Sequence, residues 1–517
     1  MAEAILARKP DDAVALIDVG EDFRAKSYSF GALRALSSRL ANLLRTLGVG
    51  AGDRVGILLS QSLELVVGHL ATYGLGAIAV PLFTLFGGDA LTYRINDAGC
   101  KILVADGQDW ERLAQIRSEW TTVQSVILTG SISGTAPDVV SWSQVERASD
   151  VFQPYRTRSD DPALIIYTSG TTGAPKGAVH AHRVLLGHMP GVAMSHQRFP
   201  QPGDLMWTPA DWAWIGGLLD VLMPSLYDGV GVIGYRPRKF DPERTIELIK
   251  RFQIRNVFFP PTALRLLRHT IPHASAYQDL KLRTIASGGE ALSPDLWDWI
   301  RTVFSVTPSE FYGQTEANLL LSNAPDVFLP QIGSMGRAVY GHHIHLIDGQ
   351  GNVSDAFESG EIALKLPDPV AFLGYWNRPD KTFVKTAGGL VHTGDLARRD
   401  ESGNFFFVGR ADDVINSSGY RMGPTEIEAA ILSHPQVSMA AVIGKPDRLR
   451  GEIVKAFVVP ASPTIDRNTV TREIQELVRQ KLGAHEYPRE VAFVDSLPMT
   501  TTGKIQRRIL REQEHER

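Results

Sequence analysis

Short apolar segments alternate with amphipathic segments along this chain up to about residue 410. Leucines recur at helical spacing over residues 33–47, and strand-like segments follow at 55–59, 77–80 and 102–105. Further along, Asp241 precedes a proline and an amphipathic stretch, which is the pattern of a capped helix start. Strands that alternate with helices favour largely parallel sheets covered by helices, so we predict an α/β fold.

The order of elements changes near residue 412. We expect helices over 424–433 and 471–482 and strands over 439–443, 455–459 and 491–494. The polar stretch GRADDVINSSGYR, residues 409–421, has no periodicity and suits a hinge. We therefore predict a large N-terminal domain of layered α/β sheets over residues 1–411. A small, mobile α+β C-terminal domain is expected over residues 412–517.

The most apolar region is residues 55–83. Gln61, Glu64 and His69 interrupt it, so no clean apolar run reaches the roughly 18 residues that a membrane span requires. We interpret this region as a strand, a buried helix and a second strand. No integral membrane association is expected.

Charge and cysteine content narrow the class of protein. The formal net charge of -4 gives no reason to expect nucleic acid as a partner. Cys100 is the only cysteine, which excludes an internal disulfide and a thiolate metal cluster and fits a reducing compartment. The N-terminal residues do not resemble a secretory signal, and we expect a cytoplasmic location.

A glycine-rich loop, YTSGTTGAPKG, covers residues 167–177 directly after an apolar segment. Its backbone N–H groups and hydroxyls can surround phosphate oxygens, and Lys176 adds a positive charge. A P-loop requires lysine directly after the last glycine and a hydroxyl residue next, and Lys176 meets neither condition. Taken alone, the stretch is equally compatible with a surface loop that binds nothing.

Three further motifs follow in order: FYGQTE at 311–316, TGDLARRDESGNFFFVGRADD at 393–413 and PMTTTGKIQRR at 498–508. Together with the glycine loop, they resemble the motifs of the acyl-adenylate-forming superfamily. That superfamily includes acyl-CoA synthetases, peptide-synthetase adenylation domains and firefly luciferase. The resemblance spans nearly the whole chain and implies that ATP, CoA and Mg²⁺ are used with a carboxylic acid.

The implied chemistry depends on charge neutralisation, because ATP brings about four negative charges and the acid adds another. Lys504, Thr171 and Glu316 are the expected catalytic residues, and Glu316 is also the expected Mg²⁺ ligand. The resemblance assigns nucleotide binding to Thr168, Ser169, Gly170, Thr171, Thr172, Gly173, Lys176, Gly289, Glu290, Ala291, Glu310, Phe311, Tyr312, Gln314, Thr315, Asp395, Arg410 and Arg421. The ribose hydroxyls would bind Asp395, and Lys504 would bridge the acid and the α-phosphate.

A second half-reaction is implied by the same resemblance. The small domain would rotate about Asp412, remove Lys504 and bring Ser418, Gly419 and Tyr420 to the pantetheine of CoA. The thiol would then attack the mixed anhydride, which yields acyl-CoA and AMP.

The acyl pocket is expected at Trp214, Ile215, Gly216, Gly288 and Gly313. Relatives that prefer acetate carry tryptophan at the position of Gly313, so glycine there predicts an acid larger than acetate, such as a short-to-medium, branched or aromatic one. The alternative is that these glycines serve only turns.

Other functions remain open from the sequence. A stand-alone adenylation enzyme that loads a carrier protein is the main alternative, followed by a luciferase-like oxygenase and a non-catalytic nucleotide-binding regulator. The HHIH stretch, residues 342–345, lacks a third ligand at a fitting spacing, so we do not expect a metal site there. A homo-oligomer is compatible with the sequence but not specified by it.

Overall fold

The computed structural model describes the chain except for residues 8, 131–135, 169–173, 236, 238, 274–276, 278, 349, 355–358, 412, 414, 418–419, 448–450, 483–485, 501–503 and 516–517. The side chains of residues 354, 416, 420, 421, 451 and 515 are also not described. The described residues form two compact units. The first comprises Met1–Gly170, Ala174–His343 and Lys365–Val391, and the second comprises Ile344–Leu364 and His392–Arg517.

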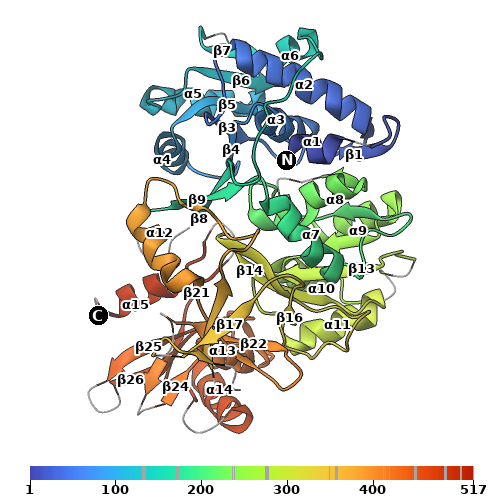
Figure 1. Cartoon of the computed structure of the whole chain (residues 1–517). Coiled ribbons are helices and arrows are strands. Elements are labelled where there is room, and N and C mark those ends of the chain that lie inside the picture. Colours follow the sequence, from blue (N-terminus) through green and yellow to red (C-terminus); the bar gives the residue numbers. More distant parts are fainter. Residues whose placement is uncertain are drawn as a thin grey trace. The chain divides into compact units, whose positions relative to one another are not determined.

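An eight-stranded sheet forms one layer of the first unit (Figure 1). Its strand order is β20 (Gly374–Tyr375), β9 (Lys176–Ala181), β8 (Pro162–Thr168), β4 (Ile78–Pro81), β3 (Arg54–Leu58), β5 (Cys100–Asp106), β6 (Ser125–Thr129) and β7 (Val139–Ser141). Neighbouring strands are parallel, except that β9 pairs antiparallel with both β8 and β20.

Helices cover both faces of this sheet. Val55 and Ile57 of β3 pack in the core that contains α2 (Phe30–Thr46) and α3 (Leu63–Gly74). Leu58 packs on the opposite face, in the core that contains α4 (Gly88–Ala98) and α5 (Trp110–Ile116). Successive strand residues point to opposite faces, so a sheet covered on both sides needs apolar residues at nearly every position. The interpretation of residues 55–83 as strand, buried helix and strand is confirmed by β3, α3 and β4.

A nine-stranded sheet forms the other layer of the first unit. Its order is β16 (Arg337–Ala338), β15 (Ala317–Ser322), β14 (Ser309–Gln314), β13 (Thr284–Gly288), β12 (Asn256–Phe258), β10 (Leu205–Trp207), β11 (Gly231–Gly234), β1 (Val14–Val19) and β2 (Ala25–Ser29). One face packs on α9 (Pro242–Phe252), α10 (Pro261–Thr270) and α11 (Pro294–Phe304). The other face shares a core with α2 and α3, and that core also holds α7 (Val184–Ser195), a π-helix (Gly216–Leu222) and α8 (Met223–Asp228).

Shorter elements complete the first unit. These are α1 (Ala2–Leu6), α6 (Ser143–Arg147) and α12 (Pro379–Lys385). The predicted α/β class of the N-terminal part is confirmed by the two helix-covered sheets, and both sheets contain runs of parallel strands.

The second unit contains two smaller sheets. Most of the first sheet belongs to this unit, and its order is β18 (Val353–Ser354), β17 (Ile344–Ile347), β19 (Gly360–Lys365), β21 (Leu390–Arg399) and β22 (Phe405–Arg410). The second sheet has the order β24 (Tyr420–Met422), β23 (Ile415–Ser417), β26 (Gly451–Pro460) and β25 (Val437–Asp447), with β27 (Glu490–Phe493) also paired to β26. One face of β25 and β26 packs on α13 (Pro424–Leu432) and α14 (Arg467–Lys481), and Leu510 of α15 (Arg507–His515) packs on the other. The predicted small α+β architecture is therefore confirmed.

Two features of the second unit differ from the sequence interpretation. The stretch 409–421 is not uniformly irregular, because β23 and β24 form an antiparallel pair within it and β23 also pairs with β26. The sequence does not predict helix α15, because the segment is short and highly charged. Leu510 is its one buried leucine, which is too little to show a helical period. The predicted hinge residue, Asp412, lies outside the described residues. The domain boundary between 411 and 412 stays a prediction, and the compact units group residues 344–364 and 392–411 with the C-terminal part.

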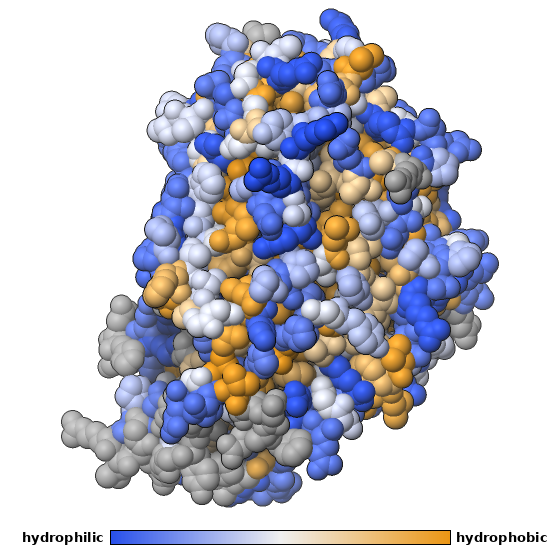
Figure 2. Space-filling model, in the orientation of Figure 1, coloured by the Kyte–Doolittle hydropathy of each residue, from blue (hydrophilic) through white to orange (hydrophobic). Residues whose placement is uncertain are grey.

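Among the described residues, no helix combines the length and the apolar composition needed to cross a membrane. Hydrophilic residues are interspersed with smaller hydrophobic patches on the face of the molecule that Figure 2 shows. The long apolar segments of the sequence are instead interior strands and helices, as β3, α3 and β4 illustrate.

The start of α9 provides a test of the local signals. The Asp241 side chain accepts a hydrogen bond from the Arg244 backbone N–H at 3.1 Å, and Pro242 occupies the first helical position, as predicted. Asp241→Ala should lower the free energy of unfolding by about 1 kcal/mol, because it leaves that N–H without its acceptor. Asp241→Asn should preserve most of the stability, which urea unfolding of both variants would measure. Equal losses in the two variants would contradict a capping role.

Candidate functional site

The predicted phosphate loop begins and ends on two adjacent strands of the eight-stranded sheet. Strand β8 ends at Thr168 and β9 begins at Lys176, and these two residues are opposite each other in the antiparallel register. The five residues expected to surround phosphate (Ser169, Gly170, Thr171, Thr172 and Gly173) lie outside the described residues. The strand pairing nevertheless holds Thr168 and Lys176 side by side at the base of the loop.

Helix α4 anchors both ends of this loop. Tyr167 donates a hydrogen bond from its hydroxyl to Asp97 Oδ2 at 2.7 Å, and Tyr93 donates to the Pro175 carbonyl at 2.9 Å. Arg378 donates to the other oxygen of Asp97 at 3.0 Å. Sequence reasoning missed Tyr93 and Asp97, because neither belongs to a motif and both are distant in sequence from the residues that they hold.

Glu316 lies at the turn between β14 and β15 and is 9% exposed. Its Oε1 accepts a hydrogen bond from the Tyr375 hydroxyl at 2.5 Å, and its backbone carbonyl accepts from Phe372 N–H at 2.9 Å. The Lys176 ammonium lies 4.6 Å from the centroid of the same Tyr375 ring. The structure thus brings together two predicted charged residues from separate motifs, with Tyr375 between them.

The chemistry of Glu316 fits an Mg²⁺ ion. Mg²⁺ is usually held by one or two carboxylates together with substrate phosphates, and it retains several waters. Within the described part of the chain, no group of three or more His, Cys, Asp or Glu residues could hold a metal by itself. A single buried carboxylate beside the predicted phosphate loop, with one oxygen hydrogen-bonded to Tyr375, suits a metal that arrives with ATP. In the HHIH stretch, His342 is instead hydrogen-bonded to Asp368, at 2.7 Å.

The predicted adenine side of the site surrounds a buried carboxyl group, Glu310. Leu292 N–H donates to Glu310 Oε1 at 3.2 Å, which joins β14 to the segment that follows β13. Gly289 has a φ of 92°, a conformation that other residues rarely adopt. Glu290 forms an ion pair with Arg265 and accepts a hydrogen bond from Thr262 at 3.3 Å.

The remaining predicted residues of β14 and its turn are close to this group. Phe311 and Tyr312 are buried on β14, and Thr315 is half-buried at the turn, while Gln314 accepts a hydrogen bond from the Lys385 ammonium at 3.1 Å. Ala291 is exposed. The nucleotide roles of these residues stay predictions, since their geometry is also compatible with ordinary packing.

In the second unit, Asp395 of β21 and Arg410 of β22 are directly opposite each other. Arg410 Nη1 donates to Asp395 Oδ1 at 3.2 Å, and Asp395 is 5% exposed. The Asp395 backbone N–H donates to Thr393 Oγ1 at 3.1 Å, which fixes the strand at this point. The structure therefore brings the two predicted ribose-side residues together as a cross-strand pair.

Lys504 directly precedes Ile505, which forms an isolated β-bridge with Met499. The Thr500 N–H donates to the Lys504 carbonyl at 2.7 Å, and the Lys504 N–H donates to Thr500 Oγ1 at 3.0 Å. The Lys504 residue itself is exposed. Its backbone is thus held while its charged side chain faces solvent, which suits a lysine that binds a ligand reversibly.

The predicted CoA and hinge residues are only partly described. Asp412, Ser418 and Gly419 lie outside the described residues. Tyr420 and Arg421 have described backbone in β24, where they pair with Ser417 and Asn416 of β23. Next to the predicted hinge residue, Asp413 forms ion pairs with Arg507 and Arg511 of α15.

At three predicted pocket glycines, an added side chain would meet neighbouring protein atoms. A Cβ at Gly288 would lie 2.6 Å from the Phe311 ring, and one at Gly216 would lie 3.1 Å from the Phe258 ring. These two rings contact each other, with centroids 5.2 Å apart. At Gly313 a Cβ would lie 2.4 Å from the backbone nitrogen of Leu319. Close packing by itself accounts for glycine at 288 and 313, so the role of these glycines in opening a pocket stays a prediction.

The other two predicted pocket residues begin the π-helix region. Trp214 is half-buried and packs near the rings of Phe83 and Phe86, with centroid distances of 5.6 and 5.9 Å. Ile215 is half-buried against the core shared by the two sheets. These side chains supply apolar surface next to Gly216.

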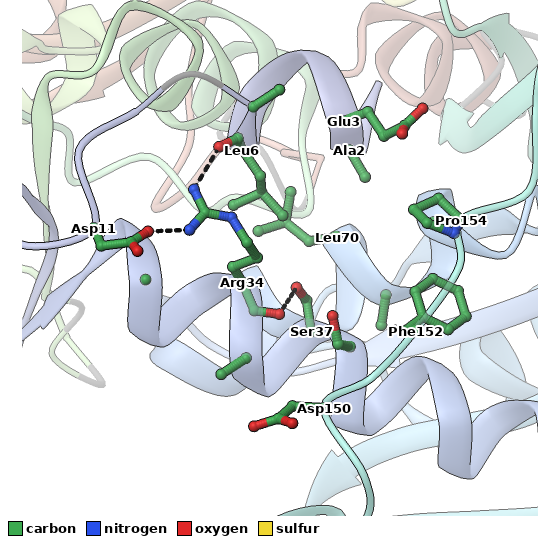
Figure 3. A pocket seen from close by; sticks show the side chains of 16 residues that line it. Ala2, Glu3, Leu6, Asp11, Arg34, Ser37, Leu70, Asp150, Phe152 and Pro154 are labelled. Atoms are coloured by element: carbon green, nitrogen blue, oxygen red, sulfur yellow. Dashed lines mark hydrogen bonds and ion pairs between the residues drawn. The ribbon is translucent and has the colours of Figure 1, made fainter.

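A separate pocket lies among α1, α2, α3 and residues 150–154 (Figure 3). Arg34 is its most prominent cation, and it already donates to the Leu6 carbonyl at 2.8 Å and forms an ion pair with Asp11. None of the predicted site residues lines this pocket. We therefore assign it no part in the site.

Comparisons with known proteins identify the family of this chain. The chain matches the model of the AMP-binding enzyme family over residues 2–376 and that of the AMP-binding enzyme C-terminal domain over residues 426–504. Acyl-coenzyme A synthetase ACSM5, mitochondrial, from Homo sapiens is 34% identical over 496 residues, which cover 94% of this chain and 84% of that protein. Acetyl-coenzyme A synthetase from Bacillus subtilis (strain 168) is 34% identical over 502 residues, which cover 94% of this chain and 85% of that protein.

A solved structure is similar over the whole chain. It is the anthranilate CoA ligase AuaEII in complex with anthranoyl-AMP, with a TM-score of 0.89 and 27% sequence identity. The similarity covers 100% of this chain and 97% of that one. The two matched family regions contain Lys176, Glu316 and Lys504, which carry the charges discussed above.

Burial of Glu310 generates a pH-dependent prediction. Desolvation raises the pKa of the Glu310 carboxyl from 4.5 to about 8, although the bond from Leu292 N–H opposes the shift. As pH rises from about 4.5 to about 8, the unfolded state releases a proton that the folded state retains, so this group makes the protein less stable across that window. Glu310→Gln should remove this contribution and flatten the pH dependence of the free energy of unfolding. Denaturant unfolding across the window would measure it, and identical pH profiles would contradict the assignment.

Proposed function

Because this chain belongs to the AMP-binding enzyme family, and is an AMP-forming ligase that joins carboxylic acids to CoA, we propose that it activates an acid larger than acetate. ATP and CoA are its other substrates. The reaction proceeds through an acyl adenylate, which CoA then consumes. The residue roles given below are part of the proposal.

In the first half-reaction, a carboxylate oxygen of the acid attacks the α-phosphorus of ATP. The new acyl–phosphate bond forms as the bond to the β-phosphate oxygen breaks, and pyrophosphate leaves with its charge. No proton transfer is required, so the task of the protein is to position the reactants and to neutralise charge. Lys176 would contact the departing phosphates, and Lys504 would bridge the carboxylate and the α-phosphate.

One observation carries this assignment. A buried carboxylate, Glu316, and a lysine at the base of the glycine loop, Lys176, contact the same tyrosine side chain. Glu316 would hold Mg²⁺, which when bound neutralises phosphate charge. A carboxylate kept from water costs free energy unless it has a partner, so a buried glutamate beside a phosphate loop calls for a cation.

In the second half-reaction, the thiolate of CoA attacks the acyl carbon and AMP leaves. We propose that the small domain turns about Asp412 for this step and that Ser418, Gly419 and Tyr420 then line the path of pantetheine. The antiparallel pairing of Ser417 with Tyr420 supports this role, since it fixes the backbone of the two residues that flank this segment. Asp413 is tied to α15 by two arginines, so the residue after the hinge moves with the helix that follows Lys504.

The size of the acid is inferred from the apolar surface near the predicted acyl segments. The rings of Phe258 and Phe311 lie against Gly216 and Gly288, and Trp214 and Ile215 add further apolar surface. Such a lining favours an acid with an apolar or aromatic group over acetate, and each buried methylene contributes about 0.8 kcal/mol. Of the similar proteins, one is named for anthranilate and another for acetate, so the relatives alone do not select the acid.

A carrier-loading enzyme remains the alternative that an assay must exclude. Acid-dependent pyrophosphate release without CoA, followed by thioester formation with free CoA, identifies the ligase. A cytoplasmic location is likewise our proposal, supported by Cys100, a buried free thiol.

Removal of Lys504 should separate the two half-reactions. Lys504→Ala should slow adenylate formation by about 100-fold or more, since a single charge-stabilising donor contributes about that much, and thioester formation from supplied adenylate should stay near the wild-type rate. Rapid-quench measurement of each step tests this prediction. Lys481→Ala, which removes an exposed lysine of α14 in the same unit, is the control. Equal loss in both steps would contradict the role of Lys504.

A panel of acids tests the size of the pocket. The kcat/KM should rise from acetate through propionate to butyrate, by at most about fourfold for each methylene buried. The accepted acids should include branched or aromatic acids of similar size. Substrate competition in one vessel would provide the ranking. A maximum at acetate, followed by a decline with each added carbon, would refute the proposed acid class. Gly313→Trp is unsuitable for this test, because the Leu319 backbone blocks its side chain.

A further inference from the structure

Tyr375 is held rigidly although it belongs to none of the sequence motifs. It lies on β20, where it pairs with Ala178 of β9, and it is 7% exposed. Its backbone N–H donates to Thr382 Oγ1 at 2.8 Å, and its ring packs edge-on against Phe372 with centroids 5.0 Å apart. A side chain fixed in this way can hold its neighbours in place at little further entropic cost.

The two ends of the Tyr375 side chain contact different charges. Its hydroxyl donates to Glu316 Oε1 at 2.5 Å, a charge-assisted bond of the short kind. The Lys176 ammonium lies over its ring, 4.6 Å from the centroid, which is within the range of a cation–π contact. Within the described part of the chain, no other side chain hydrogen-bonds the Glu316 carboxylate, so this hydroxyl alone fixes which way the carboxylate faces.

The segment around Tyr375 is also joined to the base of the phosphate loop. Trp376 Nε1 donates to the Asp97 carbonyl at 3.0 Å, and Arg378 donates to the Asp97 carboxylate. That carboxylate also accepts from Tyr167, just before the loop. Residues 375–378 are therefore tied to both Glu316 and the strand that leads into the loop.

We propose that Tyr375 is a positioning residue of the adenylation step, which sets the Glu316 carboxylate for the metal–phosphate group and holds Lys176 beside the phosphate loop. This inference rests on the proposed function. The hydroxyl occupies one oxygen of Glu316, so the other oxygen is the one that would bind the cation. The ring face also limits the rotamers of Lys176 before ATP binds. Without the ring, the lysine side chain would lose that freedom only on binding, at a cost in affinity.

The two contacts can be removed one at a time. Tyr375→Phe deletes the hydroxyl and retains the ring, whereas Tyr375→Leu deletes both. Mn²⁺ serves as the probe for Mg²⁺, and its binding to the protein–ATP complex is measured by electron paramagnetic resonance without any acid substrate. ATP binding in the presence of EDTA is measured by calorimetry.

For Tyr375→Phe we expect Mn²⁺ affinity in the presence of ATP to fall by about tenfold, the size of effect typical for one hydrogen bond to a charged group. Metal-free ATP binding should stay unchanged in this variant and should weaken by about two- to fivefold in Tyr375→Leu, which also loses the ring face. With Glu316→Ala in the background, Tyr375→Phe should have no further effect on Mn²⁺ binding, since its acceptor is gone.

A structural role alone predicts a different result. Tyr277 is a buried tyrosine of the first unit that also donates a hydrogen bond, to the Ile271 carbonyl at 2.8 Å, and it contacts no predicted site residue. Tyr277→Phe is therefore the matched control, with reduced thermal stability and unchanged Mn²⁺ affinity. If Tyr375→Phe behaves like this control, or if its effect adds fully to that of Glu316→Ala, the proposal is overturned.

A second variant covers the case in which Tyr375→Phe does not fold. Thr382→Val removes the acceptor of the Tyr375 backbone N–H, and it should weaken Mn²⁺ binding by a few-fold in the same direction. Unchanged binding in Thr382→Val would then count against the proposal. Metal-dependent ATP binding without acid-dependent pyrophosphate release in the wild type would instead overturn the proposed function, and only the part of Tyr375 in metal–ATP binding would stand.

Discussion

The arrangement of the predicted ATP-binding side depends on the antiparallel pairing of one strand, β9, with neighbours on both of its edges. On one edge β8 brings Thr168 opposite Lys176, and on the other edge β20 brings Tyr375 opposite Ala178. The remaining strands of this sheet pair in parallel, and α3, α4 and α5 lie along the chain between β3, β4, β5 and β6. The antiparallel pairing of β8 with β9 places the two residues that flank the predicted phosphate loop opposite each other, and Figure 1 shows β8 and β9 together.

Local signals in the sequence predicted local structure well. Asp241 caps α9 because its side chain needs only the N–H groups of the next turn, and the interrupted apolar run at 55–83 became β3, α3 and β4. Such features are decided within a few residues, by capping and by periodicity. Two of the four motifs supply Lys176 and Glu316, which contact the same side chain, Tyr375, in the structure.

Features that depend on distant packing could not be predicted in this way. Tyr375 and Asp97 are distant in sequence from the motif residues that they contact. The sequence around them gives no sign of these contacts, which form only when the strands of the sheet pair. Strands β23 and β24 are too short to show a period, and β23 pairs with β26 as well as with β24. The glycines are ambiguous for a related reason, since a sequence does not distinguish a glycine beside empty space from one beside a backbone nitrogen.

The close packing around Gly313, a predicted pocket residue, limits how this position can change. Leu319 has a φ of 57°, and its backbone nitrogen fills the space where a Gly313 side chain would begin. Any larger residue at 313 therefore requires a different path for the start of β15, where Asn318 also hydrogen-bonds the buried Asp220 at 2.7 Å. Positions 220, 313, 318 and 319 are thus mechanically coupled. A lineage that altered the depth of its pocket through residue 313 would have to change these neighbours first, so the same substitution could be tolerated in one relative and disruptive in another.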